Sequence, residues 1–330
     1  QAWPNQTTIP NPIERRASSQ KSPFFCGLVP SLAHPILLNL TLYYTNNTSP
    51  PQLLHSLILS QANSLTMFQF QQFTIHDDRC AMKVGTDGVL LGAWCKMPPT
   101  PSAARALDIG TGSGLIAMML AQRYPQGQIV GVELDADATT QAIENVAASP
   151  FASQIVVKQG DIMSEDWRED LQPFDMIVSN PPYFEETLLS PNQQRAQARH
   201  VHHGLTFEAL TQRSAQLLKS GGWLQVIIPK TAQPRFVRCA QDAGFSLIHQ
   251  TDVHTVARKA PKRVMLRFQL HFTPPTHHEN GHTIIGDFLQ TDQLILQENG
   301  ERSPQYQQLC ADFYLTQGQL DARASKDEKS

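Results

Sequence analysis

The chain has 330 residues, of which 41% are hydrophobic and 17% charged, and its formal net charge is −3. This length allows about two domains with a sizeable core, which excludes peptide hormones, disulfide mini-scaffolds and fibrous repeats. The small negative charge argues against a general polybasic coat, so any nucleic-acid site must be local. The five cysteines include no C-x-x-C pair, and their odd number favours a reducing compartment.

Residues 1–66 differ in composition from the rest. They contain only four charged side chains and are rich in Pro, Asn, Ser and Thr, so they have little with which to specify a core. The first methionine, Met67, precedes the first orderly alternation of apolar residues. We expect residues 1–66 to be a disordered leader or an upstream extension beyond a natural start at Met67. Prolines and polar residues interrupt the uncharged stretch 23–44, which argues against a signal or membrane segment and favours a cytoplasmic protein.

Residues 67–104 are expected to form a hairpin followed by a helix. Apolar residues alternate with polar ones at 68–76. Thr86 and Asp87 are suitable caps for a helix that runs through Val89, Leu90 and Trp94.

Strand and helix patterns alternate within residues 105–275. Seven short apolar runs predict strands: 106–109, 129–132, 155–157, 174–178, 224–228, 246–251 and 263–272. Helical spacing separates most of them, which predicts an α/β fold with a mostly parallel, Rossmann-like sheet and helices on both faces. The last two strands lack a full helix between them, so we expect an antiparallel hairpin at one edge. Residues 276–315 should add a strand region (282–297) and a helix (303–315), followed by a polar tail at 316–330.

A glycine loop follows the first strand of this sheet. Asp108 precedes Gly110, Gly112 and Gly114, where the strand should turn into a helix whose N-terminus faces a ligand. The dinucleotide pattern G-x-G-x-x-G is not met, and a carboxylate at Asp108 would repel a pyrophosphate. The same carboxylate suits a cation, so the loop favours S-adenosylmethionine over a nicotinamide dinucleotide.

Carboxylates also follow the second and third strands. Glu133 can accept hydrogen bonds from ribose hydroxyls. Asp161 can accept a hydrogen bond from the adenine amino group, with Ile162 packed against the ring. Each carboxylate alone is more often a solvated residue or a helix cap. Their positions at successive strand ends favour the cofactor interpretation, because ligands bind at the carboxyl edge of such sheets.

Asn180-Pro181-Pro182-Tyr183 follows the fourth strand. In an arbitrary loop this would be a Pro-rich turn. Beside a sulfonium site, the Asn180 side-chain oxygen and the Pro181 carbonyl can accept both N–H groups of an amine conjugated to a ring, which frees its lone pair for methyl transfer. The prolines hold these acceptors in place, and Tyr183 can stack on an extruded base.

At this point the chain resembles amino-methyltransferases with an N-P-P-Y loop. Three further stretches resemble, within them, the tRNA adenine-N6 methyltransferases that modify the adenine beside the anticodon of one valine tRNA. They are His76 to Trp94, Gln194 to Arg199, and Thr251-Asp252 with Pro261 to Leu266; the likeness spans about residues 68–315. The resemblance implies a monomeric or weakly associated class I methyltransferase that takes S-adenosylmethionine and tRNA. It also implies that Lys83, Gly85, Thr86 and Asp87 lie over the methionine end of the cofactor. From the sequence pattern itself we expect neither a metal site nor a membrane span.

Positive charge is concentrated in two places. Arg258, Lys259, Lys262, Arg263 and Arg267 lie around the last predicted hairpin, whereas Arg195 and Arg199 follow the catalytic loop. Either group could bind tRNA phosphates or simply be solubilising surface charge. A histidine-rich stretch at 200–203 lacks partners with metal-ligand spacing, so we expect a polar loop there.

Other functions remain open. N-P-P-Y enzymes also methylate a release-factor glutamine, an rRNA base or DNA adenine, and the loop alone cannot choose among them. A nicotinamide oxidoreductase is opposed by the glycine spacing and by Asp108. A non-catalytic RNA-binding module would have no use for Asn180 to Tyr183 beside a cofactor loop.

Overall fold

A computed structural model describes residues 67–99, 104–164, 173–182, 205–271 and 289–316. The predicted leader and tail, Tyr183, Arg195, Arg199 and the histidine stretch at 200–203 lie outside these ranges.

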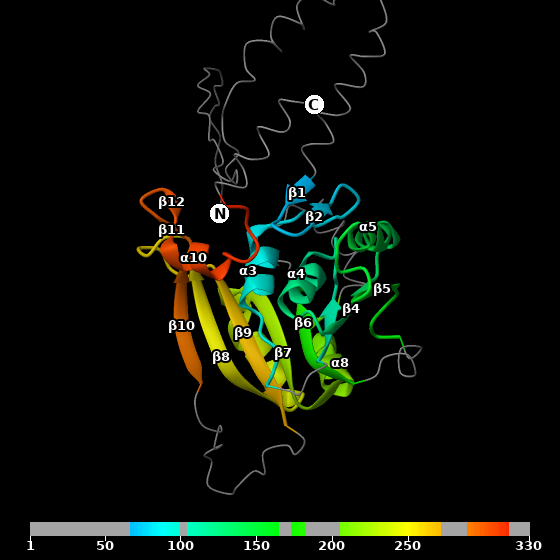
Figure 1. The fold of residues 1–330 in the computed structure, drawn as a ribbon. Coiled ribbons are helices and arrows are strands. Elements are labelled where there is room, and N and C mark those ends of the chain that lie inside the picture. The colour runs from blue at the N-terminus through cyan, green and yellow to red at the C-terminus, as the bar shows by residue number, and fades with distance from the viewer. Residues whose placement is uncertain (1–66, 100–103, 165–172, 183–204, 272–288, 317–330) are drawn as a thin grey trace, which may run out of the picture. The chain divides into compact units, whose positions relative to one another are not determined.

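An eight-stranded sheet organises the fold, in the order β10-β8-β9-β7-β6-β3-β4-β5 (Figure 1). Its strands are β3 Arg105–Ile109, β4 Gln128–Glu133, β5 Ile155–Gln159, β6 Phe174–Ser179, β7 Leu218–Pro229, β8 Phe245–His254, β9 Arg263–Leu270 and β10 Gln290–Ile295. The five strands from β7 to β5 are parallel, β9 is antiparallel to both of its neighbours, and β10 is parallel to β8. All parallel strands therefore end at one edge, where the glycine loop and Asn180 lie.

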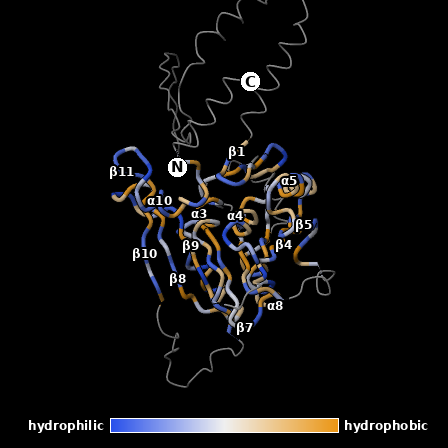
Figure 2. The backbone as a smooth tube through the Cα atoms, viewed as in Figure 1, coloured by the Kyte–Doolittle hydropathy of each residue, from blue (hydrophilic) through white to orange (hydrophobic). Residues whose placement is uncertain are grey.

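Helices cover both faces of the sheet (Figure 1). One core cluster contains residues of α3 Thr86–Trp94, α4 Leu115–Arg123 and α5 Ala136–Ala147. The other cluster contains residues of α8 Phe207–Leu217 and α9 Gln233–Asp242, the latter preceded by a 3-10 turn, η2 Lys230–Ala232. Hydrophobic residues concentrate along the central strands and α4 in Figure 2. These strands are buried on both faces, which explains their continuous apolar sequences.

The first and last described elements add a layer over α3 and α4. The hairpin comprises β1 Met67–Gln69 and β2 Thr74–His76, and the C-terminal part comprises β11 Gln297–Glu298, β12 Glu301–Arg302 and α10 Pro304–Leu309. Phe70 and Phe73 of the hairpin share a core cluster with Phe313, and the Gln71 amide donates to the Phe313 carbonyl. This contact joins segments more than 200 residues apart in sequence.

The predicted fold class is confirmed, with three differences in detail. The sheet has an eighth strand, β10, so the antiparallel pair β8–β9 is not its outermost part. The N-cap of α3 is Gly85 without any side-chain cap, so the prediction that Thr86 and Asp87 cap this helix was wrong. The predicted C-terminal helix was too long, because α10 ends at Leu309 and the chain turns at Cys310. Within the described residues, no helix is long and apolar enough to cross a membrane.

Candidate active site at the carboxyl edge of the sheet

The glycine loop leaves its backbone open to a ligand. Gly110, Gly112 and Gly114 have φ angles of 72°, 55° and 84°, a region that side-chain-bearing residues rarely adopt. A Cβ atom at Gly110 or Gly112 would meet nothing within 4 Å, so these two glycines face open space. The Gly110 and Thr111 amides donate to the Val132 carbonyl, which fixes the loop against the end of β4.

Asp108 lies beneath this loop and is fully buried. The Thr111 hydroxyl donates to Oδ2 at 2.7 Å, whereas Oδ1 is buried without a hydrogen-bond partner. Burial raises the pKa of the Asp108 carboxyl to about 7, and the Thr111 hydroxyl and the nearby Ala117 backbone N–H only partly oppose this shift. A buried carboxylate with one unpaired oxygen is a suitable counter-charge for a cation bound at the loop.

Glu133 and Asp161 end up at the same edge as the glycine loop. The Glu133 carboxylate accepts the Gly112 amide at 2.9 Å and the Asp135 amide at 3.0 Å. Each of its oxygens keeps a further lone pair for another donor such as a hydroxyl. Asp161 is exposed and accepts the Met163 amide, while the side chain of Ile162 is buried in the core. Adenine contacts for Asp161 and Ile162 stay predictions.

Asn180 follows β6, which pairs with β3 so that Ser179 lies opposite Ile109. Its Oδ1 is buried without a hydrogen-bond partner, and its Nδ2 lies 3.8 Å from the Met82 sulfur. Pro181 is buried and Pro182 is exposed. The predicted catalytic acceptor, Asn180 Oδ1, therefore has no partner among the described residues and lies beside the strand that leads into the glycine loop.

The segment before α3 reaches this edge as well. The Lys83 ammonium donates to the Asp77 and Asp78 carbonyls at 2.6 and 3.0 Å, so it closes its own loop. Asp87 forms an ion pair with Arg263 at 2.8 Å. Asp87, which was predicted to contact the cofactor, and Arg263, which was predicted to bind RNA, are therefore partners within the protein.

The other predicted RNA-binding residues that the structure describes lie beyond the end of β8. Arg258, Lys259 and Lys262 are exposed in the connection to β9. Because β9 is antiparallel to β7, this connection lies at the carboxyl edge, where Pro229 pairs with Arg263. The structure therefore places these three residues and Arg263 at the same edge of the sheet as the candidate active site.

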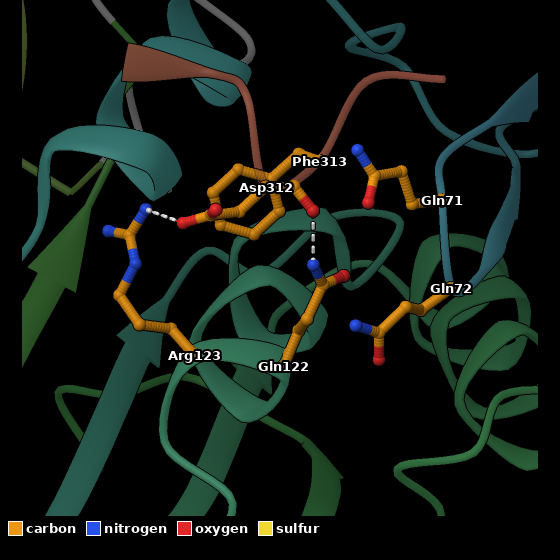
Figure 3. A pocket seen from close by; sticks show the side chains of 6 residues that line it. All are labelled: Gln71, Gln72, Gln122, Arg123, Asp312 and Phe313. Atoms are coloured by element: carbon orange, nitrogen blue, oxygen red, sulfur yellow. Dashed lines mark hydrogen bonds and ion pairs between the residues drawn. The ribbon is translucent and has the colours of Figure 1, made fainter. Parts of the chain in front are cut away.

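A recess of about 300 Å³ lies elsewhere, at the C-terminal end of α4 (Figure 3). Its lining residues are Gln71, Gln72, Gln122, Arg123, Asp312 and Phe313. The glycine loop precedes the N-terminus of the same nine-residue helix, about 13 Å away along its axis. Gln71 and Gln122 use their side-chain amides to bind backbone carbonyls of residues 311–314. The contacts around the recess join the first and last described segments of the chain. The recess is separate from the carboxyl edge of the sheet.

Sequence reasoning missed two residues near the site. Met82 contacts Asn180, and Asn145 of α5 links the glycine loop to the segment before α3. Neither residue type carries a chemical signal by itself, and both contacts join distant parts of the chain. Among the described residues, no group of three or more His, Cys, Asp or Glu side chains could hold a metal ion.

Comparisons with known proteins place the chain among methyltransferases. Residues 94–237 match the family model of the Methyltransferase small domain. The chain is 41% identical over 249 residues to the tRNA1(Val) (adenine(37)-N6)-methyltransferase of Bacteroides thetaiotaomicron, covering 75% of this chain and 97% of that one. The protein of the same name from Phocaeicola vulgatus is 50% identical over 202 residues, covering 61% of this chain and 83% of that one.

A solved structure supports the fold alone. It is described as a predicted O-methyltransferase from Agrobacterium tumefaciens and has a TM-score of 0.50 at 19% identity. The match covers 69% of this chain and 96% of that chain.

Proposed function

Because the chain belongs to the family of tRNA1(Val) (adenine(37)-N6)-methyltransferases, we propose that it moves a methyl group from S-adenosylmethionine to the exocyclic N6 of the adenine that follows the anticodon in a valine tRNA. The observation that carries the proposal is the buried, unpaired Oδ1 of Asn180 at the end of β6, beside the strand that leads into the glycine loop. An acceptor left unpaired in the free protein is ready for a donor that arrives with the substrate.

The described residues fit S-adenosylmethionine. Gly110 and Gly112 leave open space above the loop, Asp108 offers a buried carboxylate to a cationic ligand, and Glu133 keeps acceptor capacity for ribose hydroxyls. The cofactor supplies, when bound, a methyl group on a positively charged sulfur. We assign its binding to Asp108, the three glycines and Glu133. Lys83, Gly85, Thr86 and Asp87 are assigned to its methionine end, and Asp161 and Ile162 to its adenine end.

Asn180 and Pro181 act on the substrate nitrogen. The Asn180 Oδ1 and the Pro181 carbonyl accept the two N–H groups of the amine, which favours a pyramidal nitrogen with an available lone pair. That lone pair forms the new N–C bond while the methyl–sulfur bond breaks, and the surplus proton leaves to solvent. Tyr183 stacks on the extruded base in this proposal. No strong base is required, because the proton is lost after the methyl group has moved.

We expect cofactor binding to release a proton below pH 7. The pKa of Asp108 is about 7 in the free protein, and a bound cation favours the ionised carboxylate. Affinity should therefore fall by up to about tenfold per pH unit as the pH drops below 7, and should level off above it. Isothermal titration in two buffers of different ionisation enthalpy measures the released proton. Asp108→Asn should bind more weakly and release none; equal proton release by this variant and the wild type would contradict the assignment.

Arg258, Lys259 and Lys262 are proposed to bind tRNA phosphates, together with Arg263, Arg195 and Arg199. We expect Arg258→Gln and Lys259→Gln each to weaken tRNA binding and to reduce the slope of log K against log salt by about 0.7–0.9 for each lost phosphate contact. Arg238→Gln is the control, because Arg238 is an exposed arginine on α9. Filter binding at several salt concentrations measures the slopes, and identical slopes for all three variants would remove the connection between β8 and β9 from the interface.

The proposed function is tested by methyl incorporation. The full chain is incubated with methyl-labelled S-adenosylmethionine and, separately, with a panel of tRNA transcripts, rRNA fragments, short DNA and a release factor. We expect label in a valine tRNA, and mass spectrometry of its digest should show N6-methyladenosine next to the anticodon. Label in a release factor, rRNA or DNA alone would contradict the tRNA substrate but support methyl transfer. Binding of NADH and not of S-adenosylmethionine would overturn both the substrate and the reaction.

We further propose that the protein works as a monomer in the cytoplasm. All four cysteines in the described ranges are free and buried, which supports a reducing compartment.

A further inference from the structure

The loop between β2 and α3 is closed on itself by three hydrogen bonds. Asp77 is only 2% exposed, and its Oδ2 accepts the Val84 amide at 2.7 Å. Lys83 donates from its ammonium to the carbonyls of Asp77 and Asp78. These contacts join the first residue of the loop to Lys83 and Val84 near its end, so residues 77–84 have a defined shape.

Asn145 of α5 holds this loop against the glycine loop. Its Nδ2 donates to the His76 carbonyl at 2.7 Å and to the Ser113 carbonyl at 2.9 Å, and its Oδ1 accepts the His76 amide at 3.0 Å. Arg79 forms a second attachment to α5 through an ion pair with Glu144. The position of residues 77–84 is thereby tied to the loop that we assign to the cofactor.

Met82 is presented by this anchored loop to Asn180. The Met82 side chain is 54% exposed, and its sulfur lies 3.8 Å from Asn180 Nδ2. A thioether sulfur can only accept a hydrogen bond, so it pairs with the NH₂ end of an amide and not with the oxygen. Among the described atoms, Asn180 Oδ1 is left without a partner. The sulfur therefore selects between the two orientations of the Asn180 amide.

We propose that Met82 is a positioning residue for the methyl transfer: its sulfur holds the NH₂ end of Asn180, so that Oδ1 faces the incoming amine. This inference rests on the proposed function, in which Asn180 Oδ1 accepts an N–H of the substrate. Without the sulfur, the Asn180 amide can flip, so that its NH₂ group faces the N–H of the substrate amine and two donors oppose each other. The fraction of correctly oriented Asn180 then falls, and the rate of the chemical step falls with it.

The test compares variants that keep or remove the acceptor. Met82→Leu keeps an apolar side chain of similar size but has no acceptor. We expect its single-turnover rate of methyl transfer to fall about fivefold, which is the effect of losing one weak hydrogen bond. The affinities for S-adenosylmethionine and tRNA should stay within about twofold, because the loop anchors at Asp77, Lys83 and Asn145 are unchanged. Met82→Gln restores an acceptor oxygen and should recover part of the rate lost in Met82→Leu.

Val156→Ala is the matched control, because Val156 is 55% exposed on the edge strand β5, which β3 and β4 separate from β6 and Asn180. Its rate should equal that of the wild type. A Met82→Leu rate equal to the wild type would overturn the inference while leaving the proposed function intact. Weakened cofactor binding in proportion to the lost rate would also overturn it, since that result assigns Met82 to the fold of the loop. A wild-type chain that methylates none of the substrates overturns the proposed function itself.

Discussion

Asn180→Ala is expected to reduce the rate of methyl transfer by about 10²–10³-fold, the usual effect of removing one preorganised hydrogen-bonding group at the reacting centre. Asn180 Oδ1 is buried and unpaired in the free protein, so its whole acceptor capacity is available to the amine. Cofactor affinity should change little, because the residues assigned to S-adenosylmethionine lie mainly at the ends of β3 and β4. Single-turnover methyl transfer gives the rate, and isothermal titration gives the affinity.

Asn180→Asp separates the acceptor from the rest of the side chain. The aspartate keeps an oxygen in place of Oδ1 but loses the NH₂ group that bonds Met82. We expect it to be slower than the wild type and clearly faster than Asn180→Ala. If both variants are equally inactive while still binding the cofactor, acceptance of an N–H by Oδ1 is not the role of this residue.

The core of the fold could be predicted because its central strands are mostly apolar. Strands β3, β4, β6 and the second half of β7 are almost entirely buried, so each appears as a short, largely hydrophobic run that only an occasional polar residue interrupts. Their order along one edge then follows from the alternation with helices. For the same reason, the amino-acid pattern alone was enough to place the glycine loop, Glu133 and Asn180 together at the carboxyl edge.

The eighth strand could not be assigned to the sheet from its sequence. Five of the six residues of β10 are not buried, and the strand is largely hydrophilic in Figure 2. An edge strand of this kind is held by backbone hydrogen bonds to β8, which any sequence can form. The contact of Met82 with Asn180 was equally out of reach, because it spans 98 residues and depends on how Asn145 places a loop.

Arg267 was grouped with the basic surface residues around the last predicted hairpin, and this prediction was wrong because its charge is buried in the sheet. It lies on β9 with 6% exposure, and its guanidinium stacks between the rings of Trp94 and Trp223 at 4.6 and 4.9 Å. Its Nε donates to Gln225 Oε1 at 2.8 Å, and one of its NH₂ groups donates to His249 Nδ1 at 3.3 Å. Burial lowers the pKa of Arg267, which expresses the cost of removing the charge from water.

The negative charge of Asp292 is linked to Arg267 by hydrogen bonds through His249. Since Nδ1 accepts from Arg267, the proton of the neutral ring is on Nε2, which donates to Asp292 Oδ2 at 2.9 Å. The row Asp292, His249, Arg267 and Gln225 crosses four neighbouring strands, β10, β8, β9 and β7. It therefore joins the hydrophilic edge strand to the core of the sheet, and it also contacts the last carbonyl of α3 at Trp94.

Arg267→Ala is expected to lower the free energy of unfolding by about 3–5 kcal/mol, because it leaves a cavity between two tryptophans and an unpaired Nδ1 on His249, while Gln225 Oε1 keeps only the Lys96 amide. Arg267→Lys should lose less, since it keeps the charge but not the planar stacking. Arg302→Ala is the control, because Arg302 stacks on Tyr306 and Tyr314 but is exposed. Urea unfolding followed by tryptophan fluorescence and far-UV circular dichroism measures all three, and equal losses for Arg267→Ala and Arg302→Ala would contradict the role of the buried row.

The pH dependence of unfolding provides an independent signature of the same row. Burial lowers the pKa of His249, with Asp292 opposing the shift and Arg267 adding to it. A histidine whose pKa is lower in the folded state binds its proton more readily when unfolded, so stability falls as the pH drops below about 6.5. Part of this loss comes from placing a second positive charge beside Arg267. The stability of Arg267→Ala should therefore fall less between pH 7.5 and pH 5.5 than that of the wild type, and an unchanged dependence would show that the two groups are not coupled.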